Sequence, residues 1–387
     1  MKITCISRAL LLCAVVAFYS QLFVQSAFAV DFTEREIALL EAFGPWPVNT
    51  PPDPGNEYSG VAWAEQMGEV LFHNTDLSQN QAISCATCHQ SALGFSENRP
   101  VAVANETHVR NTQGLLNVGL QRWFGWDGGA DSLWAASLRP MLSTVEMNAT
   151  VETVAVRMRK NEAFVNTLHQ NDISINELND EKLVVLIAKS IGAYQRTLVS
   201  GTTAFDLFRM GLLSNDEIGL SAYTESEKRG LKLFLGSANC HVCHFGPNFS
   251  NGEFHDIGRS FFTAVGQVDG GRYAGIKRVR QDHYNLVGPF SSGNNPDDAR
   301  KTETVTLGQV NFGQWRTPTL RNLSLTGPYM HDGSLATLRD VVDFYAEIDT
   351  TRLHAQGETL LNPQRWSDAD RNDLVNFLMS LSNVVGK

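Results

Sequence analysis

Two short stretches of the sequence repeat the pattern C-x-x-C-H. They are formed by Cys85, Cys88 and His89 and by Cys240, Cys243 and His244. Two thiols one helical turn apart can add to the two vinyl groups of one haem while the neighbouring imidazole reaches its iron, so this spacing is typical of c-type haem attachment. The sequence therefore predicts two covalently bound haem c groups, with His89 and His244 as iron ligands.

Zinc binding is the competing interpretation, because cysteine pairs of this spacing also hold zinc. A structural zinc site needs four ligands brought together from both motifs, and it has no use for a histidine after each pair. The chain has six cysteines, and the two outside the motifs, Cys5 and Cys13, lie near the N-terminus. Once a leader is removed, no cysteine remains for a disulfide, so we favour haem over zinc and over a disulfide framework.

Residues 1–29 have the pattern of a cleaved signal peptide. Lys2 and Arg8 precede an uncharged stretch that continues to Asp31, and Ala27-Phe28-Ala29 forms a small-residue cleavage site. The alternative is an uncleaved membrane anchor, but the apolar run is shorter than the roughly 20 residues that span a bilayer. We expect export to the periplasm and no membrane span in the mature protein.

The charge balance argues against a nucleic-acid partner. The chain carries 41 acidic and 31 basic residues, a net charge of −10, and the predicted leader would remove two basic residues. A protein that binds a phosphate backbone usually presents the opposite balance. With 387 residues the chain is also longer than a comfortable single core, which predicts two haem-bearing domains, residues 30–207 and 208–387.

The elements that must position the two motifs form an internal repeat. Gly68–Phe72 precedes the first motif and Gly230–Phe234 precedes the second. A short loop after each motif ends in an aromatic-Ser pair, Phe95-Ser96 and Phe249-Ser250. Each half therefore predicts a cytochrome-c-like unit, and we expect a mainly α fold in which two such haem domains pack against each other, with long loops.

Helix and loop signals fill the rest of the chain. Thr224–Glu227 is a capping-box pattern, and apolar residues at helical spacing within 183–194 predict a core helix. Ser367–Leu381 predicts a closing C-terminal helix. The Gly-, Asn- and Asp-rich stretch from Ala264 to Gly313 predicts a long loop over the second lobe. The boundary between the lobes is expected near residues 200–215.

Several further segments resemble one protein superfamily. They are Ile83–Ser96, Arg110-Asn111 with Leu116-Asn117, Trp126-Asp127-Gly128, Pro140 with Glu146-Met147, and Arg316–Leu338. In this order, and over nearly the whole mature chain, they resemble the bacterial di-haem cytochrome c peroxidases and the MauG proteins. The resemblance implies an oxidoreductase that uses hydrogen peroxide as its oxidant.

The sixth ligand of the second haem separates two chemistries within that superfamily. The peroxidases have Met where the MauG-like enzymes have Tyr, and the matching residue here is Tyr345. A phenolate ligand stabilises ferric and higher iron states, whereas Met favours the ferrous state. The resemblance thus implies that Tyr345 ligates the second iron. The alternative is that Tyr345 is a helix residue packed in the core.

Three more residues are assigned roles by the resemblance. Trp126 matches a tryptophan that carries charge between the two haems. Glu146 matches a distal acid that moves a proton between the two oxygens of peroxide at the first haem. Pro140 matches an apolar wall that keeps this site open. Without the resemblance, Trp126 would be read as a core aromatic and Glu146 as a surface charge.

The resemblance also implies a calcium site and shows two departures. Asn111, Thr326 and Pro328 match positions that hold calcium between the lobes in the family, the last two through backbone carbonyls. Ala136 stands where the family commonly has a distal Gln. Ala238 stands where MauG has a surface Trp, so the route of charge to the substrate must differ.

The segment Leu116–Leu142, in which Trp123 and Trp134 flank Trp126, is most similar to MbnH-type di-haem enzymes. This likeness implies that a high-valent di-haem state oxidises a tryptophan to kynurenine on an MbnP-like partner protein, which creates a copper site.

Two other hypotheses remain open. A detoxifying cytochrome c peroxidase would need Met147 or Met330 as the ligand of the second haem. A di-haem electron carrier without catalysis would need a protein ligand on both irons, and His108 is the candidate on the first.

Overall fold

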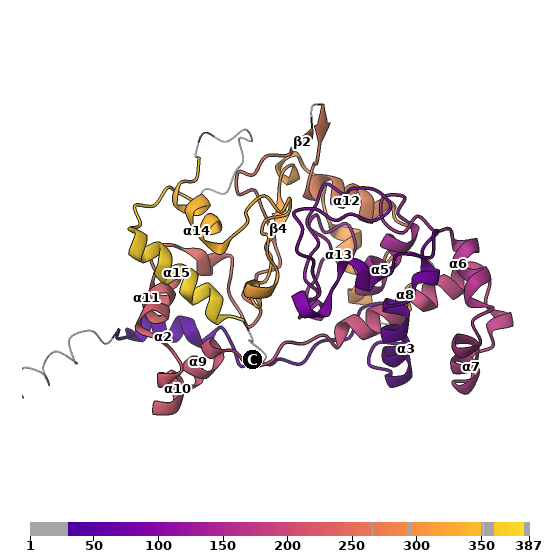
Figure 1. Ribbon diagram of the computed structural model, residues 1–387, viewed down its shortest axis with the longest axis horizontal. Coiled ribbons are helices and arrows are strands. Elements are labelled where there is room, and N and C mark those ends of the chain that lie inside the picture. Colours follow the sequence, from indigo (N-terminus) through magenta and orange to yellow (C-terminus); the bar gives the residue numbers. More distant parts are fainter. Residues whose placement is uncertain (1–29, 265, 293–295, 350, 352–359, 383–387) are drawn as a thin grey trace, which may run out of the picture.

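The computed structural model describes residues 30–264, 266–292, 296–349, 351 and 360–382. The predicted signal peptide lies outside these residues. The described chain is mainly helical and divides into two lobes side by side, with short strands and loops between and above them (Figure 1). This arrangement confirms the expected fold class.

The first lobe is built around one long central helix, α8 (Asp180–Arg196). Its residues from Leu183 to Gln195 are all buried, which confirms the predicted core helix and extends its burial beyond the apolar stripe. The helices around it are α3 (Ala62–Phe72), α5 (Leu133–Leu142), α6 (Val151–Met158) and α7 (Glu162–Gln170). The first haem motif forms the short helix α4 (Cys85–Cys88).

The second lobe has its own core, rich in phenylalanine. Its helices are α2 (Glu34–Glu41), α9 (Ala204–Ser214), α10 (Glu217–Ser221), α11 (Glu225–Leu235), α14 (Leu338–Ala346) and α15 (Asp368–Ser380). The predicted capping box at Thr224 and Glu227 starts α11, and Ser367 caps α15. Both helix predictions are therefore confirmed.

One glycine in each lobe lets two helices cross at backbone contact. A Cβ built on Gly68 of α3 would lie 2.0 Å from the carbonyl oxygen of Ser190 in α8. A Cβ built on Gly230 of α11 would lie 2.0 Å from the carbonyl oxygen of Asp373 in α15. No larger side chain fits at either crossing. The repeat that precedes the two haem motifs in the sequence is thus a repeat of one helix crossing.

The residues of the two cores are interleaved in the sequence. Leu40 and Phe43, close to the N-terminal end of the described chain, pack into the second core against Phe205 and Phe249. The N-terminal segment therefore starts at the second lobe and crosses to the first, as the indigo trace in Figure 1 shows. The boundary at residues 207 and 208 stays a prediction, but no single cut separates the two cores.

The stretch from residue 264 to 313 differs from its prediction. It contains two helices, α12 (Arg272–Gln281) and α13 (Pro296–Thr304), and it lies on the first lobe. Asp131 of the first lobe accepts hydrogen bonds from the Leu286 backbone at 2.8 Å and from the Thr302 hydroxyl at 2.6 Å. The expectation of a loop over the second lobe was wrong, because these long-range bonds outweigh a loop-like composition.

Strands contribute little. β1 (Phe254–His255) pairs antiparallel with β4 (Trp315–Arg316), and β2 (Phe262–Ala264) pairs antiparallel with β3 (Gln267–Val268). The first pair lies between the lobes in Figure 1, and the second is the hairpin at the top. Only the first pair therefore bears on how the lobes meet.

A second internal repeat joins the lobes. Trp126-Asp127-Gly128 and His331-Asp332-Gly333 form matching turns, each closed by one isolated bridge, Phe124 to Ala130 and Tyr329 to Leu335. The turns are held by reciprocal bonds between the lobes. Asn111 N–H donates to the His331 carbonyl at 2.8 Å, and Arg316 N–H donates to the Trp126 carbonyl at 2.9 Å. The interface thus has approximate two-fold character.

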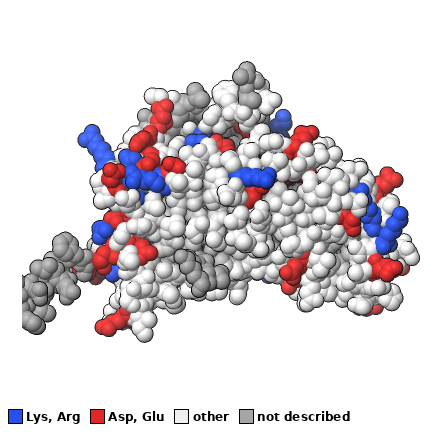
Figure 2. Space-filling view, in the orientation of Figure 1, with Lys and Arg blue, Asp and Glu red and all other residues white. Residues whose placement is uncertain are grey.

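No helix in the part of the chain that the structure describes combines the length and apolarity needed to cross a membrane. On the face drawn in Figure 2, charged side chains gather over the two ends and the rim, while the middle of the molecule is largely uncharged.

Candidate haem centres

The first C-x-x-C-H motif is a single helical turn. The Ser84 N–H donates to the Thr87 hydroxyl at 3.0 Å, and the His89 N–H donates to the Cys85 carbonyl at 2.9 Å. The His89 side chain is oriented by its own loop, because Nδ1 lies 2.8 Å from the carbonyl oxygen of Phe95. With Nδ1 as the donor to that carbonyl, Nε2 remains for a metal.

The second motif repeats this geometry. The His244 N–H donates to the Cys240 carbonyl at 2.9 Å, and His244 Nδ1 lies 3.0 Å from the carbonyl oxygen of Phe249. Both phenylalanines have positive φ, 58° at Phe95 and 49° at Phe249. This backbone turn aims the carbonyl at the imidazole. The aromatic-Ser pairs of the sequence are therefore the devices that orient the two histidines.

Burial shifts the pKa values of these groups toward their neutral forms. It lowers the pKa of His89, and it lowers the pKa of His244 to about 4, so both imidazoles are neutral at pH 7. Burial raises the pKa of Cys85 and of Cys240 to about 12. None of the four cysteines of the motifs forms a disulfide with another described residue, so all four sulfurs remain for haem attachment.

The first motif opens into a cavity of about 870 Å³. Its walls carry Glu146 and Pro140, as the resemblance implies, and also Ala136, where the family commonly has glutamine. Arg139 lies in the same wall, and its Nη1 is buried without a hydrogen-bond partner in the described structure. A buried cationic nitrogen of this kind fits the propionate of a haem.

His108 lines the first cavity as well. Its Nδ1 accepts a hydrogen bond from the Arg110 N–H at 3.0 Å, which leaves Nε2 free to bind a metal. Burial lowers the pKa of His108, and the charge of Glu146 opposes this shift. Met147 is buried in the wall of the same cavity. It therefore cannot serve as a ligand of the second haem, which leaves Met330 for that hypothesis.

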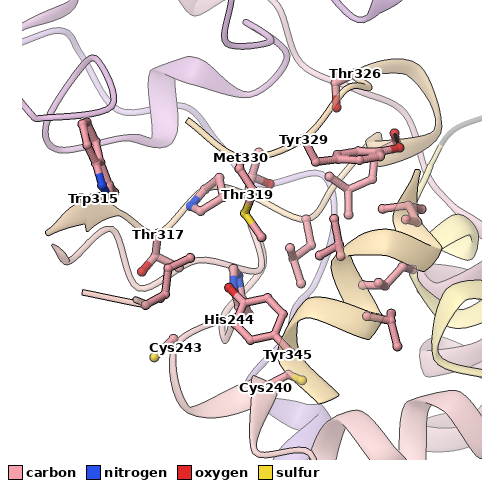
Figure 3. A pocket seen from close by; sticks show the side chains of 18 of the residues that line it. Cys240, Cys243, His244, Trp315, Thr317, Thr319, Thr326, Tyr329, Met330 and Tyr345 are labelled. Atoms are coloured by element: carbon pink, nitrogen blue, oxygen red, sulfur yellow. Dashed lines mark hydrogen bonds between the residues drawn. The ribbon is translucent and has the colours of Figure 1, made fainter. Parts of the chain in front are cut away.

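The second motif faces a separate cavity of about 250 Å³. His244, Tyr345 and Met330 all line it. In Figure 3, Tyr345 extends from α14 with its ring beside His244, and the sulfur of Met330 points into the same space. Tyr345 thus points toward His244, the predicted ligand of the second haem. The alternative of a tyrosine packed in the core away from the site does not describe its position.

Buried donors in the wall of the second cavity also fit a haem. The Arg316 guanidinium is buried, and its hydrogen bonds are long ones to the carbonyl oxygens of Gly125 at 3.3 Å and Thr317 at 3.5 Å. Burial lowers the pKa of Arg316 to about 10. Within the described residues, the indole nitrogens of Trp315 and Trp366 have no partner. These cationic and N–H groups suit the two carboxylates of a haem.

Trp126 lies in the wall shared by the two cavities, because it lines both. Its Nε1 donates to the Asn111 carbonyl at 2.9 Å, and the N–H of Asn111 is bound to His331. Asn111 therefore fixes Trp126 of the first lobe against the corresponding turn of the second. This is the position that the resemblance implies for Trp126.

The three residues of the predicted calcium site, Asn111, Thr326 and Pro328, all line the second cavity, and Asn111 lines the first as well. The side-chain amide of Asn111 donates to the carbonyls of Arg99 and Pro100 at 3.0 and 3.2 Å. This orients its oxygen away from those carbonyls. The calcium ion itself stays a prediction.

A zinc site shared by the two motifs is not formed. In the described part of the chain, no three His, Cys, Asp or Glu side chains come together in a way that would hold a metal.

Ala238 is buried in the wall of the second cavity. Nothing at this position reaches the surface to pass on charge.

Sequence reasoning missed one relation between the cavities. Pro140 of α5 and Tyr345 of α14 each follow by eight residues the residue that caps their helix, Ser132 and Thr337. They therefore occupy corresponding positions in the two lobes. The matching W-D-G and H-D-G triplets were the signal in the sequence that pointed to this second repeat.

The fold and both sites define a two-lobed protein with a C-x-x-C-H motif at each of two cavities and a tryptophan in the wall between them. Comparison with known proteins identifies its relatives. The family model for di-haem cytochrome c peroxidases, the CCP_MauG family, matches residues 63–213. The methylamine utilization protein MauG of Methylorubrum extorquens is 31% identical over 353 residues, which cover 91% of this chain and 86% of that protein.

Two further relatives agree. The cytochrome-c peroxidase IdrP1 of Pseudomonas sp. is 29% identical and covers 87% of this chain and 84% of its own. A crystal structure of a MauG-like protein associated with microbial copper homeostasis has a TM-score of 0.61 and 25% identity, and covers 88% of this chain and 96% of its own. The chain belongs to the di-haem cytochrome c peroxidase and MauG family. It is an oxidoreductase of the peroxidase type that carries two haem c groups.

Proposed function

We propose that this protein is a MauG-like periplasmic enzyme that uses hydrogen peroxide to oxidise a tryptophan on a partner protein. The observation that carries the proposal is the position of Tyr345, which shares the second cavity with His244 and points toward it (Figure 3). A phenolate oxygen opposite an imidazole favours the more oxidised states of a haem iron. A second centre of this kind suits the storage of an oxidising equivalent.

When bound, the two haems supply the redox chemistry, and the protein supplies ligands, proton transfer and positioning. His89 and His244 would hold the irons through neutral imidazoles, and a loop carbonyl orients each imidazole. Glu146 takes a proton from one oxygen of peroxide and returns it to the other as the O–O bond breaks. Pro140 has no atom that can bind a metal, so its side of the cavity stays open to peroxide.

Trp126 is positioned to share charge between the two sites. It lines both cavities, and Asn111 holds its indole N–H. An aromatic ring can lose an electron and regain it without permanent change. Asn111, Thr326 and Pro328 would bind calcium next to it and stiffen the contact between the lobes.

The substrate would be a tryptophan of an MbnP-like copper-binding protein, converted to kynurenine. Support comes from the crystal structure of a MauG-like protein associated with microbial copper homeostasis, which this chain resembles over 88% of its length. Residues 1–29 have the pattern of a signal peptide that would export this protein to the periplasm, and the partner would have to be exported as well.

The proposal is tested by spectroscopy of two variants that remove the two candidate ligand atoms from the second cavity. Tyr345→Phe should change the absorption and low-temperature electron paramagnetic resonance spectra of the second haem. It should also abolish the long-lived doubly oxidised protein that peroxide gives with the wild type. Met330→Leu should leave both unchanged. The opposite result would favour a detoxifying cytochrome c peroxidase with Met330 as the ligand.

A di-haem electron carrier without catalysis is a second candidate, because His108 lies in the first cavity and could ligate the first iron. If His108 ligates the first iron, small ligands such as cyanide should bind slowly to the wild type and fast to His108→Ala. The proposed enzyme requires fast binding to the wild type.

A further inference from the structure

Positive side chains cover most of the tryptophans of this protein. The chain has seven tryptophans, and four have a Lys or Arg side chain over the ring in the described structure. The distances to the ring centres are 3.6 Å for Arg321 over Trp46, 4.3 Å for Arg272 over Trp123, 5.1 Å for Arg110 over Trp315 and 5.4 Å for Lys189 over Trp134. Trp126, between the two cavities, has no such contact within the described residues.

Trp123 is covered most heavily. Arg272 lies 4.3 Å from its ring centre, and Lys301 approaches the same ring at 5.4 Å. Phe254 lies on Arg272 as well, at 4.0 Å, so the guanidinium contacts two rings. Trp123 is 6% exposed. Two cations from α12 and α13 therefore face one buried indole.

The charge of Arg272 has no carboxylate among its hydrogen-bond partners. The guanidinium donates to the backbone carbonyls of Asp127 and Gly128 at 3.3 and 2.9 Å. The Asp127 carboxylate is nearby but is bound by Arg110 and Arg278, each at 2.8 Å. By contrast, the cations that lie over Trp46, Trp315 and Trp134 all form ion pairs with carboxylates.

The charge of Lys301 is also without a direct ion pair in the described structure. Its ammonium donates to the Arg122 carbonyl at 2.6 Å, and the charges of Asp131 and Asp53 act on it from a greater distance. Burial lowers the pKa of Lys301 to about 8 and that of Arg272 to about 10. Both side chains thus carry their charge at neutral pH.

Trp123 is close enough to Trp126 in the chain to be oxidised by it. Three residues span at most about 11 Å of extended chain, so the two rings start from Cα atoms no farther apart than this. Phe124, next to Trp123, lines the first cavity. An oxidising equivalent on Trp126 thus has Trp123 within reach, and loss to Trp123 would lead it into the core of the first lobe.

We propose that Arg272 and Lys301 keep Trp123 reduced, so that an oxidising equivalent stays on Trp126. A cation is attracted to the electron-rich face of an indole. Once the ring has lost an electron it is positive itself, and the attraction becomes repulsion, little screened in a buried site. The two cations thus raise the potential needed to oxidise Trp123. This inference rests on the proposed function, in which peroxide oxidises the protein through Trp126.

The unwanted reaction has a defined product. Trp123 gives one electron to the Trp126 radical cation, which restores Trp126. The Trp123 radical then loses a second electron and two protons in all, and gains an oxygen from water. Hydrogen peroxide is the net oxidant, so one peroxide and one tryptophan give one hydroxytryptophan and one water.

The test uses a double variant that combines Arg272→Gln and Lys301→Gln. Its control is the single variant Arg272→Lys, which retains the positive charge. Each haem-loaded protein is treated with peroxide without a partner protein. Cleavage after Arg122 gives a peptide that begins at Trp123 and contains Trp126 and Trp134, and fragmentation in the mass spectrometer places the added oxygen. The double variant should show a severalfold gain of oxygen at Trp123, while Arg272→Lys should resemble the wild type.

Two further measurements keep the outcome decisive. Trp123→Phe in the double variant should remove the extra product, and the single variant Lys301→Gln provides a milder change if the double variant loses haem. Flash oxidation by a photo-excited ruthenium complex tests the same order of oxidation without peroxide. Equal oxidation of Trp123 in the wild type and the variants by this route would overturn the inference. Failure of peroxide to produce the long-lived doubly oxidised state in the wild type would instead overturn the proposed function.

Discussion

In the first lobe, α5 presents Pro140 to a haem cavity, and in the second lobe, α14 presents Tyr345 from the corresponding position. The surrounding elements are alike in both lobes: a glycine helix crossing, a C-x-x-C-H turn, and a carbonyl that orients the histidine. One residue has no atom that can bind a metal, and the other ends in a phenol oxygen. Under the proposed function, one scaffold makes an open site and a closed site by changing a single helix position.

The turns that join the lobes differ in the same way. Trp126 and His331 occupy corresponding positions, and each backbone carbonyl accepts an N–H from the opposite lobe. Trp126 lines both cavities, whereas His331 lines the second and stacks on Trp315 with ring centroids 3.7 Å apart. The same turn therefore places an indole between the two cavities in one lobe and a stacked imidazole in the other.

The largest expected effect tests what the lobes share. Gly68→Val and Gly230→Val should each destabilise the protein by about 3 kcal/mol or more, since the new side chain meets a backbone carbonyl. Thermal unfolding of the haem-loaded protein measures this effect. Gly308→Ala, where nothing lies closer than 3.6 Å to the new Cβ, is the control. A mild effect at one glycine alone would show that the two crossings are not equivalent.

The next prediction exchanges the residues that distinguish the lobes. Pro140→Tyr should bring a phenol into the first cavity and slow the binding of cyanide and peroxide to the first haem. Pro140→Ala should keep binding fast, because alanine has no metal-binding atom either. Stopped-flow absorption measures both rates. Fast binding in the tyrosine variant would mean that α5 and α14 do not present their residues alike.

The acid of the open site comes third. Glu146→Gln should slow the reaction with peroxide by about 10²-fold, because the amide cannot move the proton between the peroxide oxygens. Glu106→Gln, a change on the wall of the same cavity, is the matched control. Single-turnover kinetics with peroxide measure the rates. Equal rates in the two variants would remove Glu146 from the mechanism.

The smallest effect sharpens the difference between the joining turns. Burial lowers the pKa of His331 to about 4, from an ordinary value near 6.5. Between these values the unfolded chain binds a proton that the folded protein does not. The contribution of neutral His331 to the free energy of unfolding is therefore fully present above pH 6.5. Up to about 3 kcal/mol of this free energy is lost as the pH falls toward 4.

Thermal midpoints at pH 7 and pH 5 measure this loss. His331→Gln should reduce the difference between the two midpoints, and His169→Gln, a change on the surface, should not. An unchanged difference in His331→Gln would show that another group governs the acid sensitivity.

The local parts of the sites could be read from the sequence. The C-x-x-C-H motifs, the aromatic-Ser pairs and the caps of α11 and α15 each depend on residues a few positions apart, and all form as expected. Errors arose where distant segments meet. Composition predicted a loop for residues 264–313, but α12 and α13 form there and pack on the first lobe through Asp131. Met147 likewise lies by the first cavity, not the second.

The sequence by itself determined that two haem-binding turns exist, because covalent spacing alone brings two thiols and an imidazole to one face. It also carried the family resemblance that singled out Tyr345 and Trp126. Only the tertiary structure decided that Tyr345 and Pro140 correspond, that Asn111 and Arg316 join the lobes by reciprocal bonds, and that Arg272 covers Trp123. These contacts connect residues that lie about 150 to 220 positions apart, and their free energy depends on both cores being formed first.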